Sequence, residues 1–199
     1  EAGRDARGQH VATLLAFQPD EEIAQVLTID AYSAEDFLVL ATRNGRVKKT
    51  RLSEYDSNLR GGIIAINLND DDELVSARRV SENDDLLLVS RKGMSARFTA
   101  DDETLRPMGR ATSGVIGMRF RDGDSLLAMD VARPDTYVVT ITDGGFGKRT
   151  PIDDWAVKGR GILGVRAMKL VEERGSLAAA LVCVDNDQLF AIASNRSEE

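Results

Sequence analysis

The chain has 199 residues, of which 42% are hydrophobic and 30% charged, a composition typical of a folded globular protein. Its formal net charge is −7, and no apolar run approaches the roughly 20 residues that a membrane-spanning helix needs. The single cysteine, Cys183, excludes an internal disulfide, and its apolar neighbours favour a buried, inert thiol. The first residues carry neither an initiator Met nor a signal-peptide pattern, so we expect a cytoplasmic fragment of a longer chain.

The predicted elements are almost all β-strands, and one pattern recurs in chain order. A small or polar residue opens an alternating apolar run that ends in an acidic turn. This residue is His10, Gly62, Gly114 or Gly164, at intervals of 52, 52 and 50 residues. Because strand side chains alternate between the two faces of a sheet, we expect strands within 63–68 and 115–120.

A second pattern interleaves with the first at nearly the same period. Apolar alternation leads through a glycine turn into a basic strand in residues 37–50, 86–98 and 137–150, and residues 180–192 are a copy without the basic charge. The turn glycines are Gly45, Gly93 and Gly145, at intervals of 48 and 52 residues. The Asn44-Gly45 pair favours a two-residue hairpin turn, because its central positions need a positive φ.

These repeats predict an all-β, propeller-like fold. Four strands in roughly 50 residues is the size of one propeller blade, and blades arranged radially protect their sheet edges. We expect about four tandem four-stranded blades in a single domain spanning 1–199, with approximate repeats at 6–58, 59–108, 109–157 and a truncated 158–199. A long β-sandwich is the alternative, although it does not require so regular a period.

The residues that carry the repeat also carry a resemblance to a known family. The segments LVLATRNGRVKKT, LRPMGRATSGVIGMRF and GGFGKRT are similar, with their connecting Arg-Gly loops, to the C-terminal domain of the DNA gyrase A subunit of the actinobacterial type, over essentially the whole chain. A related domain occurs in the C subunit of topoisomerase IV, but the long, near-regular repeats are more similar to gyrase. The resemblance implies a β-pinwheel, in which neighbouring blades of a propeller exchange strands and the outer rim wraps DNA.

The chain departs from that family at one motif. The heptapeptide Gln-x-Arg-Gly-Gly-x-Gly, which the resemblance associates with full DNA wrapping, has no intact copy here. The nearest segment is KGRGILG at 158–164, which has Lys158 in place of Gln and Ile162 in place of the second Gly. We therefore expect DNA binding from this fragment, whereas its wrapping competence stays open.

Positive charge is concentrated in a few places on an acidic chain. Residues 42–52 hold five cations and no acid, which leaves −12 for the remainder. A protein that bends DNA without reading its sequence needs cations spaced along a convex path, and a basic hairpin in each blade supplies that spacing. The alternative is that these cations protect an exposed sheet edge from pairing with other chains.

The predicted DNA-binding residues fall into two groups. The hairpins contribute Arg43, Arg46, Lys48, Lys49, Arg51, Arg91, Lys92, Arg97, Lys148 and Arg149, and the Arg-Gly loops contribute Arg60, Arg110, Lys158 and Arg160. Lys48, Lys49, Lys148 and Arg149 are the first choices among them. We expect Arg119 and Arg166, which lie within predicted strands, to be ordinary solvated sheet positions.

No pattern of catalytic or metal-ligating residues is present. His10 is the only histidine, zinc-ligand clusters are missing, and the acidic run at 70–73 occupies a place where each repeat needs a turn. We therefore expect a noncatalytic module without metal or cofactor. The resemblance implies double-stranded DNA, the gyrase B subunit and the rest of the gyrase A subunit as partners, with the catalytic Tyr and the ATPase site outside this chain. A propeller that serves as a protein-interaction platform is the alternative function.

Overall fold

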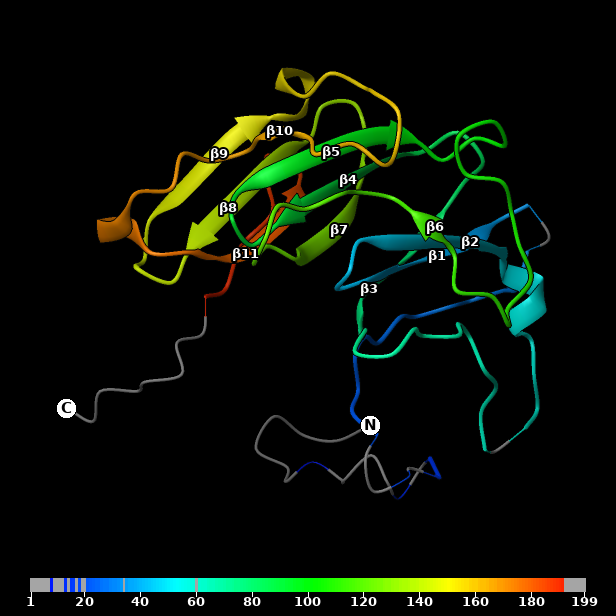
Figure 1. The fold of residues 1–199 in the computed structure, drawn as a ribbon. Helices are drawn as coiled ribbons and strands as arrows, with labels where there is room; N and C mark the ends of the chain where they lie inside the picture. The colour runs from blue at the N-terminus through cyan, green and yellow to red at the C-terminus, as the bar shows by residue number, and fades with distance from the viewer. Residues whose placement is uncertain are drawn as a thin grey trace.

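Three antiparallel β-sheets lie side by side in a computed structural model of the chain (Figure 1). The structure describes residues 8, 13, 15, 16, 18, 21–33, 35–59 and 61–191. Two residues named above, His10 and Arg60, lie outside the described residues. The predicted all-β, propeller-like fold class is confirmed, and the described residues form three sheets of four, four and three strands.

A β-hairpin forms the centre of each sheet. The hairpins are β1 (Phe37–Thr42) with β2 (Arg46–Arg51), β4 (Asp85–Ser90) with β5 (Met94–Thr99), and β8 (Tyr137–Thr142) with β9 (Gly147–Pro151). All three coincide with the hairpins predicted at 37–50, 86–98 and 137–150. Single-turn 3-10 helices, η2 (Leu52–Tyr55) and η3 (Ile152–Asp154), follow the first and third hairpins, and η4 (Glu172–Arg174) lies further along the chain.

The predicted two-residue turn at Asn44-Gly45 is wrong. Three residues, 43–45, separate β1 from β2, and Gly45 ends the turn with a φ of 79°. Three-residue hairpin loops usually have their third residue in the left-handed region. Gly93 and Gly145, at 77° and 82°, occupy the same position in the other two hairpins.

Each hairpin receives its outer strands from residues further along the chain. The sheet orders are β3-β1-β2-β6, β10-β5-β4-β7 and β11-β8-β9. One flanking strand is joined to its own hairpin by a long connecting segment, at 52–73, 100–125 or 152–176, called here a crossover segment. These flanking strands are β3 (Leu74–Val80), β7 (Leu126–Ala132) and β11 (Leu177–Cys183). The other is a two-residue strand donated to the preceding blade: β6 (Val115–Ile116) pairs with β2, and β10 (Val165–Arg166) pairs with β5.

Two sequence-predicted strands are absent or shortened for the same reason. Residues 63–68 form no strand, because no hairpin strand of the described chain lies beside them as β2 lies beside β6. In the fourth copy of the pattern, residues 180–192, only the first half forms a strand, as the end of β11. A turn at 184–187 follows, and residues 188–191 pair with no strand. A strand that depends on a neighbouring blade cannot form from its own alternation alone.

Two core clusters of the described residues lie between sheets, and a third, which contains Leu38 and Leu40, packs against the first sheet alone. One cluster joins Phe37 and Val39 of the first sheet to Leu88 and Phe98 of the second. Another joins Leu87 of the second sheet to Val138 and Trp155 of the third part of the chain. Both faces of the second sheet are therefore covered. Cys183 is buried, as predicted, and burial raises the pKa of its thiol. Within the described part of the chain, no helix has the length and apolarity to cross a bilayer.

The acidic turns hold the hairpin turns in place. The carboxylate of Asp72 accepts a hydrogen bond of 2.9 Å from the backbone N–H of Asn44. Asp124, which is 52 residues further on, accepts one of 2.9 Å from the backbone N–H of Lys92 in the next hairpin. The prediction of a merely solvated turn at 70–73 is therefore incomplete, because one acid of the turn satisfies a backbone donor of the hairpin beside it.

Two glycines at the start of the donated segments should be needed for strand exchange. Gly114 and Gly164 have φ of 73° and 78°, and a Cβ there would lie 2.4 Å from the carbonyl oxygen of Val47 and 2.2 Å from that of Ser95. We expect Gly114→Ala and Gly164→Ala each to lower the free energy of unfolding by roughly 2 to 4 kcal/mol, from backbone strain and the clash together. Urea unfolding followed by circular dichroism measures this.

The matched control for this prediction is Gly109→Ala. A Cβ at Gly109 meets no atom within 4 Å, and its φ lies outside the left-handed region. This variant should unfold at the urea concentration of the wild type. Equal stability of all three variants would contradict the proposed role of Gly114 and Gly164.

Candidate nucleic-acid interface

The ammonium group of Lys48 is enclosed by the protein. The residue has 0% exposure, and its Nζ donates to the backbone carbonyls of Ala65 and Arg110. Burial lowers the pKa of Lys48 to about 8; the carboxylate of Glu54 opposes this shift, and the nearby Arg110 adds to it. Lys48 therefore holds two crossover segments together by their carbonyl oxygens.

Lys49 is equally buried on the opposite face of β2. Its Nζ donates to the carbonyl of Ala100 at 2.6 Å, lies 3.4 Å from Oδ1 of Asp102, and sits 4.3 Å from the centre of the Phe37 ring. The expectation that Lys48 and Lys49 lie on an exposed rim is wrong. Both faces of β2 are covered by apolar clusters, so alternation directs neither side chain to solvent.

Four further predicted cations bind backbone carbonyls at the junctions between blades. Arg46 donates to Ser113 at 2.9 Å and to Gly114 at 2.6 Å. The other three contact carbonyls of the neighbouring blade: Arg97 those of Ile152 and Trp155, Arg110 that of Ile64, and Arg160 those of Thr104 and Ile116. A guanidinium satisfies carbonyls that a two-residue strand leaves unpaired. These four arginines are therefore part of the framework of strand exchange.

The remaining predicted hairpin cations are wholly or partly exposed. Arg43 donates to the carbonyl of Asp71 at 2.7 Å and lies 3.4 Å from the carboxylate of Glu73. Arg51 lies 5.4 Å from the centre of the Phe37 ring. These residues reach the surface, although each also contacts its own blade.

The third hairpin presents its basic residues to solvent. Lys148 is exposed, and its Nζ is 3.3 Å from the carbonyl of Ala167. Arg149 stacks 3.7 Å from the centre of the Tyr137 ring and pairs with Asp185, and the hydrogen bond to that carboxylate is the main cause of its raised pKa. Arg91, Lys92 and Lys158 are also exposed.

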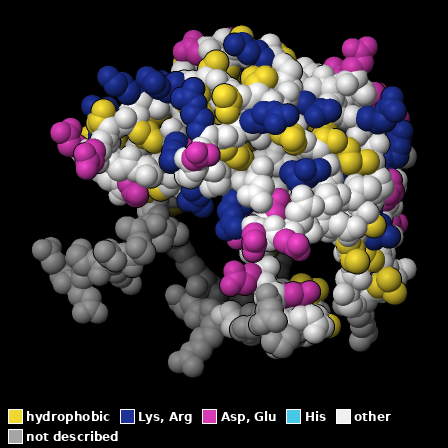
Figure 2. All heavy atoms as spheres, in the orientation of Figure 1, with side chains coloured by type: hydrophobic (Ala, Val, Ile, Leu, Met, Phe, Trp, Pro, Cys, Tyr) yellow, Lys and Arg dark blue, Asp and Glu magenta, His cyan; other side chains and the backbone are white. Residues whose placement is uncertain are grey.

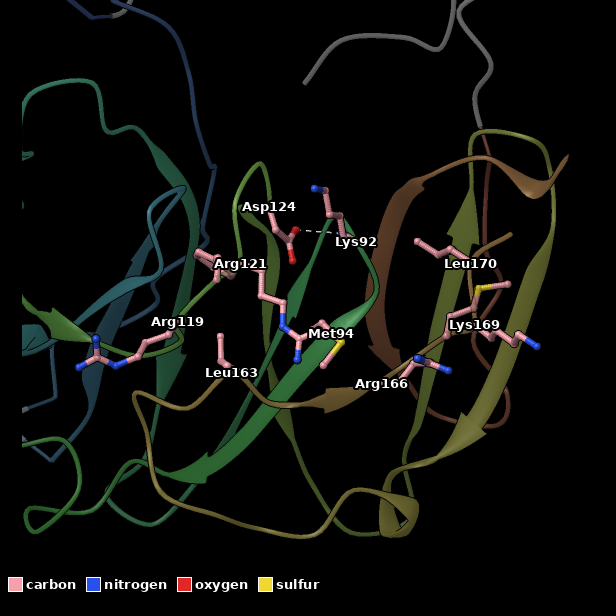
Figure 3. A pocket seen from close by; sticks show the side chains of 11 residues that line it. Lys92, Met94, Arg119, Arg121, Asp124, Leu163, Arg166, Lys169 and Leu170 are labelled. Atoms are coloured by element: carbon pink, nitrogen blue, oxygen red, sulfur yellow. Dashed lines mark hydrogen bonds between the residues drawn. The ribbon is translucent and has the colours of Figure 1, made fainter. Parts of the chain in front are cut away.

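A group of exposed cations surrounds a cavity that is lined by the second hairpin and by parts of two crossover segments, 119–124 and 163–170. The cavity has a volume of about 320 Å³, and Met94, Leu163 and Leu170 contribute apolar walls. Figure 3 shows cationic side chains around it from the β4–β5 turn and from two crossover segments. They are Lys92, Arg119, Arg121, Arg166 and Lys169, named here the crossover cluster.

Most of the crossover cluster was not predicted from the sequence. Arg121 and Lys169 had no assigned role, and Arg119 and Arg166 were expected to be ordinary sheet positions. A usable signal was present: Arg119 and Lys169 are 50 residues apart, the interval between Gly114 and Gly164. The prediction emphasised the hairpins and overlooked the segments that cross from one blade to the next.

Several members of the crossover cluster have no acidic partner. Among the described residues, no carboxylate forms an ion pair with Arg121, Arg166 or Lys169. Lys92 donates to the backbone carbonyl of Asp122 at 2.8 Å, and Arg119 to that of Gly161 at 3.0 Å, so both keep their net charge. Asp124 also lines the cavity and brings one carboxylate to these five cations, so the surface keeps an excess of positive charge, which attracts anions.

Figure 2 shows how charged side chains are distributed over one face of the molecule. Lys and Arg side chains form a broken band across the upper part of this face, and many Asp and Glu side chains gather at its ends and below it. The chain as a whole is acidic, but on this face many Lys and Arg side chains gather along the band. A band of this kind suits an extended polyanion better than a single small ion.

The described part of the chain offers no group of three or more His, Cys, Asp or Glu side chains that could hold a metal ion.

A family model of the gyrase C-terminal domain, described as a β-propeller, matches three consecutive parts of this chain, residues 36–81, 84–133 and 136–183. The chain belongs to this family. Each match contains one hairpin and the flanking strand that follows it, so the family's repeat unit coincides with the blade-forming hairpins. The repeat boundaries predicted from sequence lie elsewhere and stay a prediction.

Curated relatives bear names that agree with the family. The DNA gyrase A subunit of Streptomyces coelicolor is 61% identical over 197 residues, covering 96% of this chain and 23% of that protein. The DNA gyrase A subunit of Mycolicibacterium smegmatis is 59% identical over 194 residues, covering 98% of this chain and 23% of that protein. The chain therefore spans about a quarter of the length of these relatives.

Solved structures share the strand-exchanged fold. A gyrase A C-terminal domain superposes with a TM-score of 0.80 at 25% identity, covering 91% of this chain and 60% of that one. The C-terminal domain of a DNA topoisomerase IV also gives 0.80, at 27% identity over 89% of this chain and 55% of that one. The blade arrangement of this gyrase-family chain is thus common to both kinds of domain.

Replacing Lys48 should change how the stability of this gyrase-family domain depends on pH. The folded-state pKa of about 8 lies below the ordinary 10.5, so between these values the unfolded chain binds more protons than the folded one. The free energy of unfolding of the wild type should therefore rise with pH across this window, relative to Lys48→Met, by about 1 to 3 kcal/mol. Urea unfolding at about pH 7.5 and about pH 10 measures the difference.

The same measurement on Lys148→Met corrects for the general effect of replacing a lysine by methionine, since Lys148 occupies the equivalent position in the third hairpin. A difference between wild type and Lys48→Met that stays constant with pH would contradict an enclosed ammonium at residue 48.

Proposed function

We propose that this chain is a noncatalytic module that binds and bends double-stranded DNA through sequence-independent phosphate contacts. The observation that carries the proposal is the crossover cluster, in which cations without acidic partners line one face of a gyrase-family domain. Phosphate contacts of this kind supply affinity and orientation without reading base sequence. The helices that the structure describes are short 3-10 turns, which fits a backbone-directed mode of binding rather than the insertion of a helix into a groove.

The proposed contact residues are a revision of the set predicted from sequence. Exposed hairpin and loop cations remain in it, the enclosed Lys48 and Lys49 leave it, and the crossover cluster enters it. Arg46, Arg97, Arg110 and Arg160 act first on backbone carbonyls and so contribute mainly to the framework. The revised set is Arg43, Arg51, Arg91, Lys92, Arg119, Arg121, Lys148, Arg149, Lys158, Arg166 and Lys169. Arg60, which lies outside the described residues, stays in the set as predicted from sequence.

The module belongs, in this proposal, to an ATP-dependent type II topoisomerase. Its partners are DNA, the gyrase B subunit and the remainder of the gyrase A subunit, and its place is the cytoplasm, at the nucleoid. The names and coverage of the relatives support this context, since this chain matches about a quarter of each of these gyrase proteins. DNA held on the module would supply the bend from which the holoenzyme introduces negative supercoils.

Charge-neutralising substitutions in the crossover cluster should weaken DNA binding. We expect Arg121→Gln/Arg166→Gln to lower the affinity for a duplex of about 40 base pairs at least tenfold at about 50 mM salt, and to reduce the magnitude of the log–log salt slope by about 2. Fluorescence anisotropy of a labelled duplex across a salt series measures both. The unsubstituted chain should show a slope of about −4 to −5 if its face makes about five contacts.

A matched control is Arg79→Gln/Arg133→Gln, which removes the same charge elsewhere. These arginines pair with Asp36 and Asp84, away from the crossover cluster, and exposed ion pairs contribute little to stability. The control should bind DNA nearly as well as the wild type. If both double variants weaken DNA binding equally, the loss of affinity reflects net charge rather than the crossover cluster. If the wild type does not bind DNA at low salt, the alternative function as a protein-interaction platform is favoured.

A further inference from the structure

One cation recurs at the same register of every hairpin. Lys49, Arg97 and Arg149 each follow their turn glycine by four residues. Their backbone partners across the hairpin are Val39, Leu87 and Val139 respectively. The three residues therefore occupy equivalent positions in successive hairpins, and their contacts can be compared directly.

At the first junction, Lys49 binds the second blade with both its side chain and its backbone. Its Nζ donates to the carbonyl of Ala100 at 2.6 Å, immediately after β5. Its own carbonyl accepts a hydrogen bond of 2.8 Å from the backbone N–H of Met108. The two bonds fasten the edge of the first hairpin to the chain that leaves the second hairpin.

At the second junction, Arg97 makes the same pair of contacts with the third blade. Its Nη1 donates to the carbonyl of Ile152 at 3.0 Å and to that of Trp155 at 3.1 Å, and its own carbonyl accepts from Lys158 at 2.8 Å. Ala100 and Ile152 each follow their turn glycine by seven residues, and Met108 and Lys158 are 50 residues apart. The junction is thus built twice with the same geometry.

The guanidinium of Arg97 also binds a residue of its own blade. Its Nε donates to Asp85 at 2.9 Å, and the two side chains are only 12% and 16% exposed. A guanidinium held at both ends is a rigid link, since its donors have fixed directions. Lys49 is fully buried and has Asp102 at 3.4 Å as its charge partner. Neither cation is accessible to a phosphate in this arrangement.

Arg149 occupies this position in the third hairpin, the last one that the structure describes. Among the described residues, no hydrogen bond joins its side chain to a carbonyl of another blade; it stacks on Tyr137 and pairs with Asp185, and its side chain is 48% exposed. Arg149 therefore provides an internal comparison for the two junctions.

We propose that Lys49 and Arg97 are positioning residues that fix the angle between consecutive blades, and that this angle sets the curvature of the path along which DNA is held. The first half of the inference concerns the protein alone, and the second half rests on the proposed DNA-binding function. The two cations act through the blade they hold: each aligns the exposed cations of neighbouring blades along one curve, and a polyanion that follows these cations must bend.

The first experiment measures the angle without DNA. Spin labels at exposed positions of successive blades, Asp56→Cys with Glu103→Cys for the first junction and Glu103→Cys with Asp153→Cys for the second, report distances by double electron–electron resonance. Lys49→Met should broaden the first distance distribution about twofold and leave the second unchanged, and Arg97→Met should do the reverse, as a freed hinge would. Lys49→Arg should restore a narrow distribution.

The second experiment separates bending from binding. End-to-end energy transfer in a labelled duplex of about 40 base pairs, at saturating protein, should fall for Lys49→Met and Arg97→Met, whereas the salt slope of their affinity should stay within about 0.5 of the wild type. Arg149→Met should leave the distance distributions unchanged. A slope that falls by about 1 for each variant would instead identify Lys49 and Arg97 as phosphate contacts and overturn the proposal.

Folding of the variants is checked by circular dichroism. If Lys49→Met does not fold, Arg97→Lys serves as the test instead. A lysine at position 97 keeps the charge but cannot reach both carbonyls and Asp85 together. Arg97→Lys should therefore broaden the second distance distribution and leave the first unchanged. Unchanged distance distributions in Arg97→Lys and Arg97→Met would overturn the proposed role of Arg97 in fixing the angle between blades. If neither the wild type nor any variant binds DNA, the proposed function fails, but the resonance distances still decide whether Lys49 and Arg97 fix the angle between blades.

Discussion

The structure depends on satisfying the backbone carbonyls where the chain crosses from one blade to the next. The donated strands β6 and β10 contribute only two residues each, so most of the crossover backbone has no ladder partner. Buried carbonyls without donors are costly, and here Lys and Arg side chains supply the donors. Lys48, Arg46 and Arg160 each reach carbonyls of this kind. The exchange of strands is thus stabilised by positive charge as well as by apolar packing between sheets.

This arrangement gives the basic residues two separate tasks. Cations at the hairpin edges and in the Arg-Gly loops build the junctions, and cations on the outer side of the crossover segments remain free of acidic partners. The division explains how an acidic chain carries a positive face. The acidic turns take part in the framework too, since Asp72 and Asp124 accept hydrogen bonds from the hairpin turns beside them. The position of a charged residue within the repeat, rather than the net charge of the chain, therefore determines where charge lies on this domain.

The family assignment and the geometry lead to one consistent account of DNA binding. A rigid series of blades, joined at a fixed angle, presents cations at regular intervals, and duplex DNA that contacts them in turn must follow the same curve. The curvature is then a property of the junctions and the affinity a property of the exposed face. In this account the two properties can be changed independently, because Lys49 and Arg97 lie inside the junctions while Arg121 and Arg166 lie outside them.

The sequence by itself determined the fold class, the repeat and the three hairpins, because strand alternation and turn glycines are local signals that recur at a fixed interval. It also determined that Cys183 is buried, since an apolar run has few alternatives. Only the tertiary structure decided which cations face solvent. Lys48 and Lys49 stand in a strand whose two faces are both covered, and residues 63–68 have the pattern of a strand without a neighbour to pair with. Burial and pairing here depend on other blades, about 50 residues away, and no local pattern records that.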